Sequence, residues 1–128
     1  RLIVGEICEL DSTGDLDISL ARYNHIIDCK TAALIEASAR IGAIIAGFEK
    51  PEVEKFGKIG AHFGIAFQII DDLLDYGVGA TDLDKAKFTD LSNGLATLPL
   101  ILYFEKVSPE EKSEMKDLLK ESPETCSP

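Results

Sequence analysis

The sequence has 128 residues, of which 45% are hydrophobic, and this size and composition are typical of a single globular domain with its own core. A formal net charge of −10 argues against nucleic acid or an anionic membrane surface as the main partner and suits a site that binds metal cations. Three cysteines without CxxC spacing argue against a zinc site or a disulfide scaffold, and they indicate a reducing compartment.

The chain begins without an initiator methionine and inside an apolar pattern, so we expect it to be a piece of a longer protein. Its apolar stretch at residues 32–48 contains Glu36 and Arg40, which are four residues apart and are expected to pair on a helix. The sequence therefore predicts no transmembrane segment. We expect a soluble intracellular protein, located in the cytoplasm, or in a mitochondrion or plastid if a leader directs it there.

Apolar residues at helical spacing dominate the first half of the chain. Residues 1–10 have the pattern of the last turns of a helix, and the polar residues at 11–15 indicate a loop. One long helix, or two collinear ones, is expected from residue 18 to residue 47, because this stretch is rich in Ala, Ile and Leu and contains no proline. Asp17 is its expected N-cap.

The second half of the chain has clearer start signals. Pro51 lies in the first turn of an expected helix that continues to about Tyr76 and is followed by a charged loop. A short helix is expected at residues 97–104 and an amphipathic helix at residues 108–120, after which residues 121–128 have the composition of a frayed tail. Nothing indicates a strand, so the sequence predicts an all-α fold.

The segment GIAFQIIDDLLDY at residues 64–76 places three carboxylates in an otherwise apolar helix. On a helical wheel, Gln68, Asp71, Asp72 and Asp75 fall within a wedge of about 100°. Because the other positions are apolar, we expect this helix to lie in a core, where carboxylates are costly unless a cation meets them. Oxygen ligands at i, i+1 and i+4 suit Mg²⁺, which completes its shell with waters and phosphate oxygens. The wedge predicts an Mg²⁺-diphosphate or Mg²⁺-triphosphate site.

Other interpretations of the acidic wedge are less consistent with the sequence. A generic acidic cluster is more often a solvated face or a set of helix ion pairs, but the apolar surroundings argue against that here. An EF-hand is excluded, because the third ligand position counted from Asp71 is Leu73 and the required glycine is Tyr76. Four glycines are expected to permit close helix packing rather than to bind a ligand, namely Gly42, Gly47, Gly60 and Gly64.

Four segments in order resemble motifs of the trans-prenyl diphosphate synthases, also called polyprenyl synthetases. Residues 67–75 resemble the second aspartate-rich motif of that family, and residues 29–32 resemble its Lys-Thr pair. Residues 83–91 and 94–99 are similar to its LGKPxxxDL and Gly-x-x-Thr-Leu-Pro segments. A DDxxD motif alone is a weak signal, whereas four motifs at the spacing of one family are a specific one.

The resemblance implies an isoprenoid-synthase-type helical bundle around a central cavity, with residues 1–120 as the C-terminal part of one domain. The implied enzyme is a prenyltransferase that condenses isopentenyl diphosphate head-to-tail with an allylic diphosphate in isoprenoid biosynthesis, with Mg²⁺ as cofactor. This chain would supply the second Mg²⁺-diphosphate half-site and would be inactive alone. The implied assembly is a homodimer or a hetero-oligomer. Two alternatives stay open: a non-catalytic regulatory subunit of a hetero-oligomeric synthase, and a terpene cyclase of the same fold.

The resemblance also implies roles for the three aspartates. Asp71 would ligate Mg²⁺ directly, and Asp72 and Asp75 would act directly or through bound waters. Two departures from the family pattern affect the loop that follows, where Asp84 replaces the usual glycine and Ala86 the usual proline. Asp84 would place a negative charge beside the diphosphate and weaken its binding.

Four further residues have roles implied by the resemblance. Lys30 and Lys85 would bind the allylic diphosphate, and Thr31 and Gln68 would present oxygen dipoles to the positive charge that develops on the allylic carbon. Without the family, Lys30 and Thr31 would be an ordinary helix lysine and a core threonine, and Lys85 a solubility residue of a loop.

Overall fold

The computed structural model describes residues 1–78 and 88–121, and within them it contains helices and no strand. In chain order the elements are α1 (Leu2–Asp11), α2 (Leu20–Ile27), the π-helical turn η1 (Asp28–Ala32), α3 (Ala33–Ile45), α4 (Lys50–Asp75), α5 (Thr89–Ser92), α6 (Leu98–Phe104) and α7 (Pro109–Glu121). The all-α prediction is confirmed. In this part of the chain, no helix combines the length and the apolar character needed to cross a bilayer.

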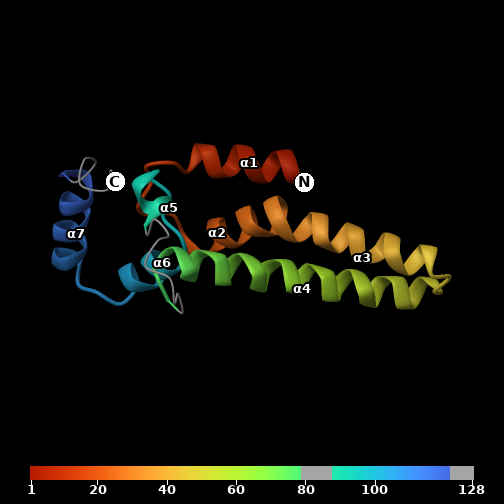
Figure 1. Ribbon diagram of the computed structural model, residues 1–128. Coiled ribbons are helices and arrows are strands. Elements are labelled where there is room, and N and C mark those ends of the chain that lie inside the picture. The colour runs from red at the N-terminus through yellow and green to blue at the C-terminus, as the bar shows by residue number, and fades with distance from the viewer. Residues whose placement is uncertain (79–87, 122–128) are drawn as a thin grey trace.

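A long antiparallel helix pair forms the centre of the molecule (Figure 1). α2, η1 and α3 follow one another without a break, as predicted for residues 18–47, and they run beside α4. α1 packs against η1 and α2 on the side away from α4, while α5 and α6 lie at the end where α4 stops. α7 lies beyond α6 at that end. Segments from both halves of the chain therefore meet at the C-terminal end of α4.

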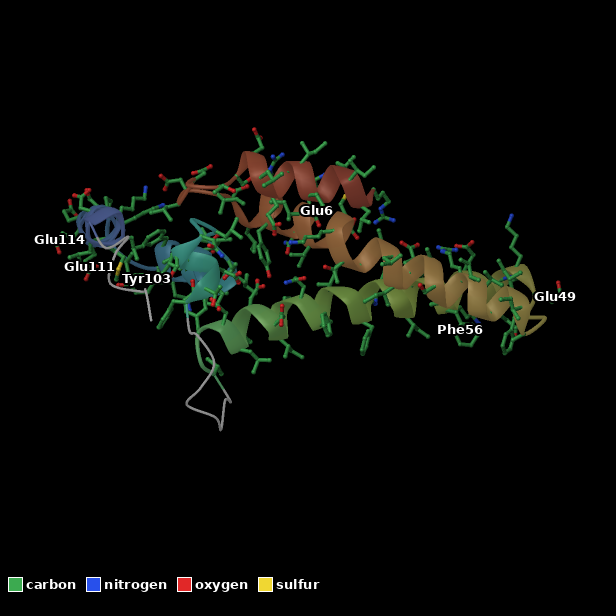
Figure 2. All side chains as sticks on the ribbon, turned by 45° about the horizontal axis from the view of Figure 1, so that its top comes forward. Glu6, Glu49, Phe56, Tyr103, Glu111 and Glu114 are labelled. Atoms are coloured by element: carbon green, nitrogen blue, oxygen red, sulfur yellow. The ribbon has the colours of Figure 1, made fainter. Side chains whose placement is uncertain are left out.

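The tight connection from α3 to α4 follows from its local sequence. Gly47 has a φ of +80°, and its N–H group donates to the carbonyl of Ile44 at 3.0 Å, which ends α3. The side chain of Glu52 accepts a hydrogen bond of 3.1 Å from the N–H group of Glu49, and Pro51 lies in the first turn of α4 as predicted. Figure 2 shows Glu49 at this far end of the helix pair.

Glycines let α4 lie directly against the backbone of η1 and α3. A Cβ atom added to Gly64 would lie 2.6 Å from Cα of Ala32, and one added to Gly60 would lie 2.8 Å from Cβ of Ala39. The prediction of close packing is confirmed for these two glycines. It is wrong for Gly42 and Gly47, where an added Cβ atom would meet nothing within 4 Å.

One side of α4 is exposed, contrary to the expectation of a helix buried on all sides. The exposed fractions of Phe63, Phe67 and Ile70 are 62%, 52% and 56%. The expectation rested on the apolar character of nearly the whole helix surface, but η1 and α3 cover only one side of it. None of the described segments covers the opposite side, so the prediction is wrong for this chain.

The start of α2 differs from the prediction. Ser19 caps the helix, because its Oγ accepts a hydrogen bond of 3.1 Å from the N–H group of Arg22. The predicted cap, Asp17, instead pairs with two lysines of α7, with Lys112 at 2.8 Å and with Lys116. These two hydrogen-bonded lysines lower the pKa of Asp17 below its ordinary value. Asp17 therefore connects α7 to the segment that precedes α2.

Candidate functional site

A cavity of about 280 Å³ is lined by residues of α1, α2, η1, α4 and α5 and of the segment before α6. Five charged side chains line it, namely Glu9, Lys30, Asp71, Asp72 and Asp90. Among these described residues the acids outnumber the single base, so the cavity has an excess of negative charge. Such a cavity favours a bound cation, or an anion that carries its own cations.

Lys30 is held at the edge of the cavity by an ion pair. Its Nζ atom donates to Oε2 of Glu9 at 2.6 Å, and the two side chains are 33% and 23% exposed. Burial acts to lower the pKa of Lys30, but the hydrogen bond and the charge of Glu9 outweigh it, so the pKa is raised. Gly5 permits this arrangement, because a Cβ atom there would lie 2.5 Å from the backbone N of Lys30. Lys30 is therefore a permanent positive charge in the site.

The π-helical turn η1 carries Lys30 and Thr31, whose side chains have different partners. Lys30 pairs with Glu9 of α1, whereas Oγ1 of Thr31 donates to Oε1 of Gln68 on α4 at 2.9 Å. π-helical turns occur frequently at functional sites, where they alter the direction of side chains within a helix. The turn thus connects the predicted Lys-Thr pair to both neighbouring helices.

Asp72 is almost completely buried, and both of its carboxylate oxygens accept hydrogen bonds. The hydroxyl of Tyr23 donates to Oδ2 at 2.5 Å, and Nε2 of Gln68 donates to Oδ1 at 3.1 Å. Burial raises the pKa of Asp72, and these two donors oppose the shift. The pKa of Tyr23 is also raised, first by burial and then by Asp72.

Asp75 lies at the end of α4 and binds the backbone that begins α5. Its Oδ1 accepts from the N–H group of Thr89 at 2.9 Å, and its Oδ2 accepts from that of Asp90 at 3.2 Å. These contacts hold Asp90 at the cavity, where burial and then the charges of Asp75, Asp72 and Asp71 raise its pKa to about 6. Asp90 therefore lies in a buried place among carboxylates whose negative charges oppose its ionisation.

Asp71 is exposed and lines the cavity. Within residues 1–78 and 88–121, no hydrogen bond engages its carboxylate, in contrast to Asp72 and Asp75. The three predicted metal ligands therefore have different surroundings, and Asp71 is the one whose oxygens accept no hydrogen bond from any described residue. Lys85 and the neighbouring departures Asp84 and Ala86 lie outside the described residues.

The donor set at this site fits Mg²⁺ in part. Its acidic groups are all carboxylates, which are the ligands that Mg²⁺ prefers. No three His, Cys, Asp or Glu side chains of the described segments converge so as to hold a metal ion by themselves. Mg²⁺ usually takes one or two carboxylates together with waters and substrate phosphate oxygens, so this arrangement suits an ion that arrives with a phosphorylated ligand.

The structure brings to the site two residues for which the sequence predicted no role. Tyr23 is on α2 and Glu9 is on α1, and both line the cavity. A signal existed for Tyr23, because a tyrosine on the buried face of a helix needs a partner for its hydroxyl. For Glu9 the signal was its position four residues after Gly5, which places both on one helix face.

Comparisons with known proteins agree with this geometry. The chain matches the family model of Polyprenyl synthetase over residues 1–127. It is 36% identical over 117 residues to octaprenyl diphosphate synthase of Escherichia coli K12, an alignment that covers 91% of this chain and 36% of that protein. A polyprenyl synthase from Caulobacter crescentus CB15, solved in complex with calcium and isoprenyl diphosphate, superposes with a TM-score of 0.83 at 38% identity. That match covers 97% of this chain and 38% of the other.

A second solved structure gives the same result. Decaprenyl diphosphate synthase from Rhodobacter capsulatus superposes with a TM-score of 0.82 at 32% identity, covering 91% of this chain and 36% of that chain. The chain thus spans little more than a third of the length of these relatives. The family match nevertheless extends over nearly all of its own residues, and it includes every described element of the cavity. The chain belongs to the polyprenyl synthetase family.

Proposed function

We propose that the protein containing this chain is a trans-prenyl diphosphate synthase, which condenses isopentenyl diphosphate head-to-tail with an allylic diphosphate in isoprenoid biosynthesis. The chain supplies the second Mg²⁺-diphosphate half-site and is inactive alone. The observation that carries this proposal is the convergence of Lys30, Gln68, Asp71 and Asp72 in one cavity. The family resemblance had assigned all four of them to the site.

The names of the relatives support the proposal. The Caulobacter protein was solved with a divalent cation and a diphosphate, and these are the two kinds of ligand that the acids and the lysine of this cavity suit. The comparisons favour neither of the two alternatives, the regulatory subunit and the terpene cyclase. A homodimer and an intracellular location remain part of the proposal, and a sedimentation measurement on the full-length protein tests the dimer.

The three aspartates have separate tasks in this proposal. Asp71 would hold Mg²⁺ through its carboxylate, while Asp72 and Asp75, one residue and four residues further along α4, would act directly or through bound waters. When bound, Mg²⁺ supplies positive charge that stabilises the departing diphosphate. Asp75 also anchors Asp90 to the cavity through backbone hydrogen bonds.

The remaining residues act on the substrate itself. Lys30 and Lys85 bind the oxygens of the allylic diphosphate, since an ammonium group is a good partner for phosphate. Thr31 and Gln68 direct oxygen dipoles at the carbon from which the diphosphate leaves, and fixed dipoles of this kind favour a cationic transition state. The electron pair for the new bond comes from the double bond of isopentenyl diphosphate, which then loses a proton.

The test is incorporation of labelled isopentenyl diphosphate by the full-length protein, with allylic primers of several lengths, with and without Mg²⁺. Asp71→Ala is expected to lower kcat/KM by about 100-fold or more, because it removes the available metal ligand. Asp117→Ala changes an exposed aspartate of α7 and serves as the matched control, with unchanged activity expected. Absence of elongation by folded wild-type protein with every primer would overturn the proposal.

A further inference from the structure

Tyr23 has a buried hydroxyl that donates to a buried carboxylate. The exposed fractions of Tyr23 and Asp72 are 4% and 3%, and the two oxygens are 2.5 Å apart. A hydrogen bond from a hydroxyl to an ionised carboxylate is short and stronger than one between neutral groups. The family motifs in the sequence give Tyr23 no role, although it lines the cavity.

In the hydrogen bonds that connect Thr31 and Gln68 to Asp72, each donor lies on the side away from Asp72 and each acceptor on the side toward it. Both carboxylate oxygens of Asp72 accept hydrogen bonds, so the amide nitrogen of Gln68 faces Asp72 and its amide oxygen faces Thr31. Thr31 must then donate its hydroxyl proton to Gln68, at 2.9 Å. Every donor in this chain of hydrogen bonds points toward Asp72. The oxygen of Thr31, at the other end, is left with lone pairs for any further partner.

We propose that Tyr23 is a positioning residue, which fixes Asp72 so that Asp72 orients the Gln68 amide, and the amide oxygen in turn orients the Thr31 hydroxyl with its lone pairs toward the reacting carbon. That a reacting carbon lies here rests on the proposed function. The direction of the hydrogen bonds follows from the donors and acceptors alone. Aligned hydrogen bonds polarise one another, so the charge of Asp72 increases the electron density on the Thr31 oxygen. Asp72 thus influences the reaction through Gln68.

The position of Tyr23 explains why its hydroxyl is needed. Tyr23 belongs to α2 and Asp72 to α4. Their hydrogen bond therefore joins two helices through residues that are 49 positions apart in sequence. Without the hydroxyl, Oδ2 of Asp72 loses its side-chain donor in a buried place, which is unfavourable. The carboxylate is then free to rotate toward other donors, and the orientation of Gln68 is no longer fixed.

The kinetic experiment compares Tyr23→Phe with Tyr103→Phe in the full-length protein. Tyr103 is an exposed tyrosine toward the α7 end of the molecule, so the same chemical change there is a matched control (Figure 2). Tyr23→Phe is expected to lower kcat about tenfold, the factor expected for loss of one hydrogen bond to a charged group. KM for the allylic diphosphate and the Mg²⁺ concentration at half-maximal rate are expected to change less than about twofold. An unchanged kcat, or an effect confined to KM or Mg²⁺, overturns the inference.

A second measurement does not depend on activity. The free energies of unfolding of Tyr23→Phe, Asp72→Asn and the double variant form a double-mutant cycle, and we expect the two effects to be non-additive. Additive effects overturn the inference even if the enzyme is active. If wild-type protein elongates no primer while the cycle is non-additive, the proposed function fails and the hydrogen-bonded chain stands. The two failures are therefore distinguishable.

Discussion

The Nζ atom of Lys30 lies 2.6 Å from Oε2 of Glu9, so the lysine proposed to bind diphosphate is already paired with a carboxylate. Both side chains are partly exposed, and a pair of this kind contributes at most about 1 kcal/mol to stability. An incoming diphosphate must share Lys30 with Glu9 or displace it. Glu9 therefore competes with the diphosphate for the ammonium group of Lys30.

Replacing Glu9 by glutamine should strengthen anion binding. Glutamine retains an oxygen that accepts from Lys30, so the lysine stays in place while one negative charge leaves the cavity. We expect the Kd of inorganic pyrophosphate with Mg²⁺ to fall about threefold, measured by titration calorimetry, since nearby like charges repel by amounts of this order. Glu6→Gln, also on α1, is the control for a change of charge on that helix (Figure 2). Weaker binding in Glu9→Gln alone would show that Glu9 supports the ligand.

Gly5→Ala should destabilise the protein. The added Cβ atom would lie 2.5 Å from the backbone N of Lys30, so α1 must move away from η1. Overpacking of this kind costs about 1–3 kcal/mol, which denaturant unfolding measures directly. Gly42→Ala is the matched control, because its Cβ atom meets nothing within 4 Å and alanine favours a helix. Equal stability of the two variants would contradict the close packing of α1.

The ion pairs of Asp17 should make the attachment of α7 depend on pH. Lys112 and Lys116 lower the pKa of Asp17 in the folded protein, so its contribution is present above the ordinary value of 3.8. This contribution to stability is lost as the pH falls through the lowered pKa that Asp17 has in the folded protein, because Asp17 then takes up a proton. We expect Asp17→Asn to lower Tm slightly at pH 7 and not at pH values below the folded pKa, as followed by thermal unfolding. A Tm difference that persists at low pH would rule out the charge of Asp17 as its cause.

The helices were predictable because their signals are local. Gly47 and Pro51 mark an end and a start by their own backbone preferences, and the Glu36–Arg40 pair, at 2.9 Å, follows from a spacing of four residues. The N-cap of α2 was missed by two residues, because Asp17 and Ser19 are both good caps and the choice depends on the distant Lys112. Sequence patterns within a few residues of the helix start contain no information about the ion pair between Asp17 and Lys112.

The candidate site was predictable in its membership but not in its geometry. The wedge on α4 identified Asp71, Asp72 and Asp75 as a group, yet the structure surrounds each of them differently. The difference arises from partners far along the chain, since Tyr23 is 49 residues from Asp72 and Thr89 is 14 residues from Asp75. Burial of α4 was overestimated for a related reason, because an apolar helix surface does not tell which segments cover it.

The π-helical turn Asp28–Ala32 determines how the two halves of one long helix are rotated relative to each other. A π-helical turn bonds residue i to i+5, so it contains one residue more than an α-helical turn, and that residue shifts the phase of everything after it by about 100°. With α2 fixed by Tyr23 and Ile27, the phase of α3 is what brings Ala39 to Gly60. Deleting a single residue in this turn would leave a regular helix of good composition with its α4-facing surface turned aside. The length of this turn is thus a constraint as strict as the identity of Lys30 and Thr31.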